Sequence, residues 1–376
     1  MQLDLTRGFS PSTQTSEAIR VVRPLLIILI SFAHFSILDQ MSRINSAATL
    51  DFNNWMMVFL KACLAKSGVP LLSLISGYLA VVTLEKYGYF RVLLRKARRL
   101  VWPLFWSNLL FIILITYPAQ ALDPSVRPDL DIYPFNAMGW FQATFAYYKI
   151  PANEPLYFLK DLYTCFLLLP LLVLVARVKF LNVAVIAWMA YKCIYLQSAF
   201  FFEVFPLWFM RFDIVFAFYI GILLFYWKKN LFIDNRNLSI GLAVLFPLIS
   251  GLASAMYVVL AKPDHLSLFL WTDFVVKLCS VLGCIAIMSL LVHSAGKLTR
   301  MFSWLSPFSY TLFLTHLFSF TFFEQAYLGL FPVPEFFKLS GILYLVAILA
   351  TAILVSIVLK SAWSGLVRVV VPRAGA

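Results

Sequence analysis

Ten long apolar segments alternate with polar connections along the chain, and this pattern predicts its architecture. The segments cover residues 20–39, 69–84, 100–119, 156–176, 180–196, 209–227, 239–261, 267–293, 307–327 and 336–360. A hydrocarbon core of about 30 Å needs about 20 helical residues, so segments of this length predict membrane spans. We expect an all-α, polytopic transmembrane helical bundle of about ten spans over residues 20–361, between polar tails at residues 1–19 and 362–376.

The composition excludes a soluble globule with one core, because 62% of the residues are hydrophobic and 12% are charged. The net charge of +13 does not indicate nucleic-acid binding, since basic residues collect in the short connections between apolar segments. The tails and the connections assigned to one side contain nineteen of the 30 Lys and Arg residues. The same regions contain only four acidic residues. This bias predicts that both termini and the connection at residues 85–99 are cytoplasmic.

A histidine interrupts the first apolar segment, which reads RVVRPLLIILISFAHFSILD. His34 follows Arg23 by eleven residues, so a helix with Arg23 at the headgroup layer would carry His34 roughly 16 Å deeper, near the bilayer midplane. An ionisable group at that depth indicates a functional site, and histidine transfers protons near neutral pH. The structural alternative is a neutral imidazole that hydrogen-bonds a neighbouring helix.

Two other polar residues are expected at a similar depth. Helical rise from the inner ends of their segments places His316 and Ser76 roughly 13 and 12 Å into the membrane. We therefore expect His34, His316 and Ser76 to line one buried cavity. Alternatively, Ser76 with Gly77 only lets two helices approach closely.

Six basic residues lie within residues 85–99, most of them in the run RVLLRKARRL at residues 91–100. Such a cluster sets topology and binds anionic lipid headgroups. The planar fork of arginine also suits phosphate, so a second hypothesis is a site for the nucleotide end of an acyl carrier such as coenzyme A. Both interpretations stay open on the residues alone.

Several ionisable residues occur inside the remaining apolar segments. Asp273 and Lys277 are four residues apart and can pair along one helix face, and this spacing favours mutual neutralisation over function. The others are Lys160, Asp161, Lys192, Arg211, Asp213 and Glu324. The sequence contains no Walker loop, GxSxG elbow, HExxH motif or zinc-finger spacing, so we expect no metal.

Five motifs, in order along the chain, resemble those of the acyltransferase-3 family of integral-membrane O-acyltransferases. They are Arg23-x10-His34, GVPLLSLISGYL (68–79), RKARRLVWP (95–103), PLYFLKDL (155–162) and LSPFSYTLFLTHLF (305–318). Leu71 and Leu72 stand where the family usually has aromatic residues. Phe313 stands where a tyrosine is common, which puts a hydroxyl contact at this position in doubt.

The resemblance implies an enzyme in which His34 is catalytic and Arg23 is its motif partner. By position in the motifs, the acyl donor would bind Arg95, Arg98 and Arg99. The residues lining the site would include Ser76, Tyr310 and His316. The donor would be acyl-CoA (succinyl-CoA or acetyl-CoA), with no permanently bound cofactor.

The acceptor implied by the resemblance is a sugar hydroxyl of a lipid-linked or nascent bacterial exopolysaccharide. The chain is most similar to stand-alone members that decorate polysaccharides, in particular the exopolysaccharide succinyltransferases of rhizobia. This likeness implies a multi-pass protein of the bacterial inner membrane, in contact with membrane lipids and polysaccharide-synthesis proteins. No nucleic-acid partner is expected.

Two other functions stay open: a transporter or flippase for a lipid-linked sugar, and a non-catalytic subunit of a polysaccharide-synthesis complex. The sequence shows no internal repeat of the kind common in transporters, and the ordered motifs weigh more strongly against transport. For an enzyme, His34 would be either the general base or a covalent carrier of the acyl group.

Overall fold

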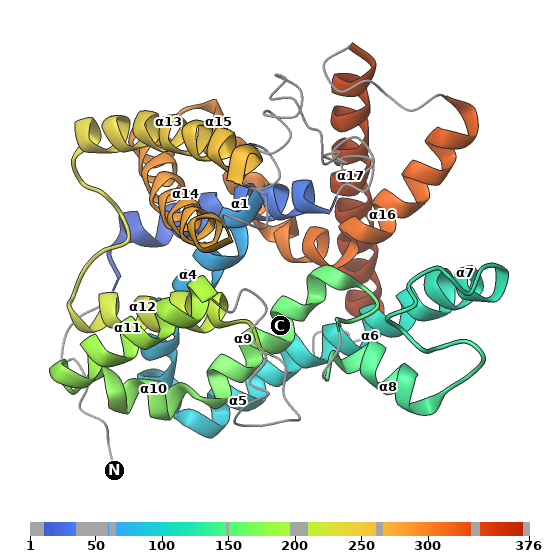
Figure 1. The fold of residues 1–376 in the computed structure, drawn as a ribbon, viewed down its shortest axis with the longest axis horizontal. Coiled ribbons are helices and arrows are strands. Elements are labelled where there is room, and N and C mark those ends of the chain that lie inside the picture. Colours follow the sequence, from blue (N-terminus) through green and yellow to red (C-terminus); the bar gives the residue numbers. More distant parts are fainter. Residues whose placement is uncertain are drawn as a thin grey trace.

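The computed structural model describes residues 11–34, 59, 65–147, 150–195, 210–260, 266–331 and 339–370. These ranges are almost entirely helical and contain no β-strand (Figure 1). The all-α prediction is therefore confirmed.

Each of the ten apolar segments overlaps a helix within the described residues. Those after the first are α4 (Gly68–Tyr87), the continuous helical stretch of α5 (Tyr89–Lys96), η3 (Ala97–Val101), α6 (Trp102–Phe111), η4 (Ile112–Thr116) and α7 (Tyr117–Leu122), the pair α9 (Tyr157–Leu167) and α10 (Leu169–Ala176), α11 (Lys179–Tyr195), α12 (Phe212–Tyr226), α13 (Arg236–Leu260), α14 (Leu266–Ser294), α16 (Ser309–Leu330) and α17 (Leu339–Val370). Among the described residues, five helices are long and apolar enough to span a membrane, or six if a pair bent by 59° at Leu168 counts as one. A polytopic protein follows, whereas ten spans and cytoplasmic termini stay predictions.

The first helix begins and ends earlier than the apolar pattern predicts. Helix α1 (Thr13–Ala33) starts inside the segment expected to be a tail, because the Ser12 hydroxyl accepts a hydrogen bond from the Thr15 backbone N–H and caps the helix. It ends before His34, whose backbone N–H bonds the Ser31 carbonyl at 3.0 Å. The helix thus begins before the segment predicted at residues 20–39, and residues 35–39 lie outside the described residues. At the other terminus, α17 extends to Val370, into the predicted tail.

Two predicted connections contain helices of their own. The connection at residues 120–154 holds α8 (Ala137–Phe145) and the short turn η5 (Glu154–Leu156), and the connection before the ninth segment holds α15 (Lys297–Leu305), followed by η8 (Ser306–Phe308). Asn136 caps α8 by accepting hydrogen bonds from two backbone N–H groups. Local capping of this kind supports helices too short and polar to be found from an apolar pattern.

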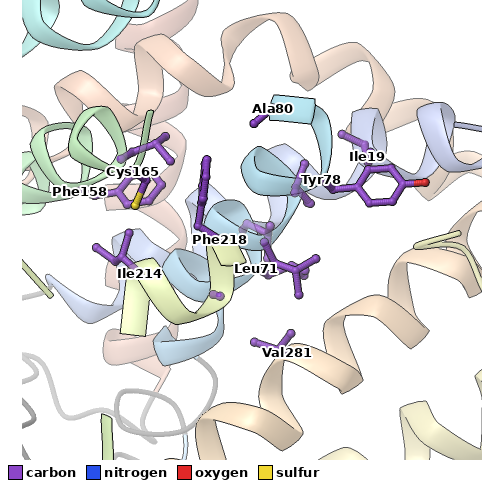
Figure 2. Close-up of a cluster of buried hydrophobic side chains, with 14 of the residues drawn as sticks. Ile19, Leu71, Tyr78, Ala80, Phe158, Cys165, Ile214, Phe218 and Val281 are labelled. Carbon is purple, nitrogen blue, oxygen red and sulfur yellow. The ribbon is translucent and has the colours of Figure 1, made fainter. Parts of the chain in front are cut away.

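The most extensive contact between two helices in the described chain joins α4 to α12. A Cβ atom on Gly77 would lie 1.9 Å from the Phe218 carbonyl oxygen, and one on Gly221 would lie 2.1 Å from that of Leu74. Both positions must therefore be glycine for the helices to cross this closely. Figure 2 shows Phe218 among buried side chains of α4 and α9.

Helix α1 crosses the middle of the molecule, where it contacts α4, α14, α15 and α16. In Figure 1, α13 and α14 lie side by side to the left of the α1 label, and α16 and α17 lie to its right. Because α1 carries Arg23 and leads directly into His34, this placement surrounds each of them with side chains from helices distant in sequence.

Candidate active site

His34 lies directly after the last residue of α1, beside a second histidine. Its ring centroid is 5.8 Å from that of His316 on α16, with 52° between the ring planes. The structure thus brings together two histidines that are 282 residues apart in the sequence. The two histidines predicted at similar depth are therefore neighbours.

His316 is fully buried and held in a defined protonation form. Its Nδ1 lies 2.8 Å from the Phe313 carbonyl oxygen, which can only accept, so Nδ1 carries the hydrogen. In a neutral ring, Nε2 is then a proton acceptor, and it is buried with no hydrogen-bond partner among the described residues. Its ring also packs edge-on against Phe320, at 5.5 Å between centroids. His316 therefore presents an unsatisfied basic nitrogen beside His34.

One cavity, which we call the His34 cavity, opens at this end of α1. Its volume is about 440 Å³, within the range of small-molecule sites. Apolar residues such as Ile30, Ala33 and Pro70 form one part of it. The ionisable and aromatic polar residues lining the rest are Glu154, Tyr157, Arg211, Asp213, Asp273 and Lys277.

A second cavity, which we call the basic cavity, has a volume of about 460 Å³. Its charged lining is Arg23, Lys96 and Arg99, and no Asp or Glu is among the described residues that line it. The ammonium of Lys96 lies 4.2 Å from the centroid of the buried Phe166 ring. Repulsion from Arg23 and Arg99 acts on the same ammonium. Such a concentration of positive charge fits an anionic ligand.

Polar groups from two helices complete the basic cavity. Ser76 of α4 lines it, as do Ser309 and Tyr310 of α16. The Tyr310 hydroxyl donates a hydrogen bond to the Arg99 carbonyl oxygen, so α16 is tied to η3, the segment that carries Arg98 and Arg99.

The two cavities lie at the two ends of one stretch of α1. Arg23 and Ile27 line the basic cavity, whereas Ile30 and His34 line the other. Eleven residues of helix separate Arg23 from His34 by roughly 16 Å. The expectation of one cavity for His34, His316 and Ser76 is therefore corrected: Ser76 lines the basic cavity with Arg23, and His316 is not among the described lining residues of either cavity.

Phe313 and His316 connect the two sites. Phe313 lines the basic cavity, and its ring centroid lies 6.0 Å from that of His316. Since His316 in turn contacts His34, a continuous row of rings runs from one cavity to the other.

The residues expected to bind the donor separate in the structure. Arg99 lines the basic cavity, but Arg95 and Arg98 are not among its described lining residues. The Arg95 guanidinium instead lies 3.8 Å from the centroid of the Tyr87 ring. A role for Arg95 and Arg98 rests on the resemblance alone.

Lys96 is a cavity residue that motif comparison missed. It is three residues before Arg99, a spacing that places two side chains on one face of a helix, so helical periodicity within RKARRL was the available signal. The wide turn of η3 (Ala97–Val101) changes the angular positions of the residues that follow. That change could not be read from spacing.

Several ionisable residues of the apolar segments line a cavity, although their spacing favoured simple charge neutralisation. Asp273 and Lys277 do form the expected pair, at 2.9 Å between Oδ2 and Nζ. They also line the His34 cavity, as do Arg211 and Asp213. Their presence in apolar segments was the signal for a site. Within the described part of the chain, no group of three or more His, Cys, Asp or Glu residues is arranged to hold a metal ion.

Comparisons with known proteins agree with these features. The family model described as an acyltransferase domain matches residues 16–361. The chain is 32% identical over 286 residues to the succinoglycan biosynthesis protein ExoH of Rhizobium meliloti (strain 1021). The aligned region covers 74% of this chain and 72% of that protein. No solved structure matches the chain significantly. Since the family model spans both cavities and both histidines, the chain belongs to the acyltransferase-3 family.

Proposed function

We propose that this protein transfers a short acyl group, succinyl or acetyl, from acyl-CoA to a sugar hydroxyl of a bacterial exopolysaccharide. The observation that carries the proposal is the His34–His316 pair, which lies between a cavity lined by three cations and a cavity of mixed charge. Such an arrangement gives two substrates of different charge access to one pair of imidazoles.

The basic cavity is proposed as the donor site. Coenzyme A carries several phosphate charges, and guanidinium groups bind phosphate through paired hydrogen bonds. Arg23, Lys96 and Arg99 would contact the phosphates, and Ser76 and Tyr310 would line the passage toward His316. Arg23 lies toward the end of α1 that is rich in positive charge, so we place this cavity toward the cytoplasm.

His34 is proposed as the group that handles the acceptor proton or the acyl group. As general base, His34 takes the proton of the sugar hydroxyl while its oxygen attacks the thioester carbonyl; the C–S bond then breaks, and the CoA thiolate takes up the proton. As acyl carrier, neutral His34 attacks the thioester carbonyl first; the C–S bond breaks, and the CoA thiolate takes up the proton that the ring loses. The sugar hydroxyl then attacks the acyl-imidazole, the bond between the ring nitrogen and the acyl carbon breaks, and that nitrogen takes up the hydroxyl proton. In either route the Nε2 of His316 can accept a hydrogen bond beside His34.

The acceptor and setting are proposed from the named relative, which acts in succinoglycan biosynthesis. A lipid-linked or polymeric glycan would occupy the His34 cavity, in a multi-pass protein of the inner membrane that has lipids and polysaccharide-synthesis proteins as neighbours. The transporter alternative gains no support from either comparison.

Purified protein in detergent tests this function directly. With either succinyl-CoA or acetyl-CoA and chemically de-esterified polymer from the host, we expect one ester on the polymer for each free CoA thiol released. Protein that is folded yet forms no ester with either donor would contradict the proposal. Comparing the two donors identifies the acyl group.

A further inference from the structure

The charged wall of the His34 cavity consists of Tyr157, Arg211, Asp213, Asp273 and Lys277. We propose that this wall binds the acceptor and selects an uncharged sugar unit, so that a sugar bearing a carboxylate is rejected. This inference rests on the proposed function, and it assigns the acceptor site to residues outside the five family motifs, apart from Tyr157 in the fourth.

One half of the wall is a rigid cluster centred on Arg211. Its Nε and Nη2 donate to the two carboxylate oxygens of Asp213, at 3.2 and 2.7 Å, and its Nη1 donates to the Tyr157 hydroxyl at 2.7 Å. The guanidinium carbon lies 4.8 Å from the centroid of the Tyr157 ring. The cluster fixes donors and acceptors in place before a ligand arrives, which lowers the entropy lost on binding.

The cluster is also anchored from behind. The backbone N–H of Arg211 donates to Asp161 at 3.2 Å, and Asp161 pairs with Lys160 at 3.1 Å. That second pair is almost fully buried and does not line the cavity. The pair Lys160–Asp161 therefore supports the fold, whereas the members of the pair Arg211–Asp213 lie at the surface of the cavity.

Asp273 and Lys277 of α14 form the other half of the wall. Their side chains pair at 2.9 Å, with 2% and 15% of their surfaces exposed. Arg211 and Asp213 are 28% and 13% exposed, so each pair keeps part of its surface open to the cavity. Carboxylates accept and cations donate hydrogen bonds, and vicinal sugar hydroxyls can satisfy both at once.

The fixed charges of the cavity decide which sugars fit. With Glu154, the lining holds three carboxylates and two cations, so its formal charge is −1 while His34 is neutral. A carboxylate on the acceptor would meet this excess of negative charge at low dielectric. The basic cavity has a net positive charge. The two cavities can therefore bind different substrates, the anionic donor in the basic cavity and the neutral acceptor in the His34 cavity.

The test measures binding without transfer. The probe is a neutral oligosaccharide prepared from the host's de-esterified polymer, compared with the same oligosaccharide after oxidation of one primary alcohol to a carboxylate. Wild-type protein, titrated by its tryptophan fluorescence without acyl-CoA, should bind the neutral form at least about tenfold more tightly. This ratio corresponds to about 1.4 kcal/mol.

Two variants separate binding from fold. The double variant Asp273→Asn/Lys277→Gln removes both charges together, so neither is left buried without its partner. We expect its Kd for the neutral form to rise about tenfold with the KM for acyl-CoA unchanged. Asp273→Asn alone leaves a cation in the wall and should reduce the preference for the neutral form. The control pair, Arg127→Gln/Asp129→Asn, removes an ion pair at 3.0 Å outside the cavity and should change neither constant.

The outcomes distinguish this inference from the proposed function. Unchanged oligosaccharide binding in the folded double variant, or equal wild-type affinity for both forms, would overturn the inference and leave acyl transfer intact. Normal selective binding with no transfer from either acyl-CoA would support the inference and overturn the function.

Discussion

Replacing His34 by alanine should remove nearly all acyl ester from the secreted polysaccharide while the polymer itself is still made. A positioned proton-transfer group contributes about 10²- to 10⁴-fold to a rate, and a covalent carrier cannot be bypassed, so either role for His34 predicts a loss of at least about 100-fold. The measurement is ester content per sugar in the exported polymer, with total sugar determined in the same samples.

The matched control is His293→Ala, which removes a histidine whose Nε2 donates to the Ile233 carbonyl at 3.0 Å, away from both cavities. Each variant must be present at the wild-type level in the membrane, since losing a polar contact between helices costs about 1–2 kcal/mol. Normal ester content in His34→Ala would rule out the catalytic assignment. Loss of the polymer itself would favour a transporter.

Neutralising the basic cavity should weaken the use of acyl-CoA more than it slows the chemical step. A hydrogen bond to a charged group contributes about 1.5–3 kcal/mol, and about 1.4 kcal/mol corresponds to a factor of ten. We therefore expect Lys96→Gln and Arg99→Gln each to raise the KM for acyl-CoA by about 10- to 100-fold, with a smaller change in kcat. Initial rates over a range of acyl-CoA concentrations provide both constants.

Arg95→Gln is the informative comparison, because Arg95 belongs to the same basic segment but lies over the Tyr87 ring. If the lining of the cavity decides donor binding, its KM should stay within about threefold of wild type, since an exposed cation–π contact contributes only about 0.5–1 kcal/mol. Equal effects at positions 95, 96 and 99 would instead assign the whole segment a general electrostatic role. Unchanged KM in Lys96→Gln and Arg99→Gln would move the donor elsewhere.

The helices were predictable because long apolar segments leave few alternatives to a membrane helix. Their ends were not, because they depend on local contacts. The Ser12 cap starts α1 seven residues before the apolar segment begins, and Pro170, in the first turn of α10, follows the bend at Leu168 in a segment that reads as one span.

The site was predictable in its residues more than in its arrangement. Depth along the apolar segments placed His34 and His316 at similar levels, and the structure brings their rings into contact. The same reasoning failed for Ser76, because depth says nothing about which way a residue faces. In the structure Gly77 packs against the backbone of α12, and the neighbouring Ser76 lines the basic cavity with Arg23.

The arrangement of the charged wall of the His34 cavity depends on tertiary packing. Asp273 and Lys277 can be paired from their spacing, but Arg211 is 62 residues before Asp273 in the chain, and no periodicity indicates that they line one cavity. A general rule was nevertheless available: ionisable residues within apolar segments face a cavity or one another. Here the pairs Arg211–Asp213 and Asp273–Lys277 each face one another and also line the His34 cavity.

The central claim is that an acyl group passes from a donor in the basic cavity, through the His34–His316 pair, to an acceptor in the His34 cavity. The most direct test uses sealed membrane vesicles of known orientation. Acyl-CoA labelled in its acyl group is supplied at the cytoplasmic face, and the neutral oligosaccharide is enclosed at the opposite face. We predict labelled ester on the enclosed oligosaccharide and free CoA on the cytoplasmic side. Ester formation only when both substrates share one face would contradict the claim.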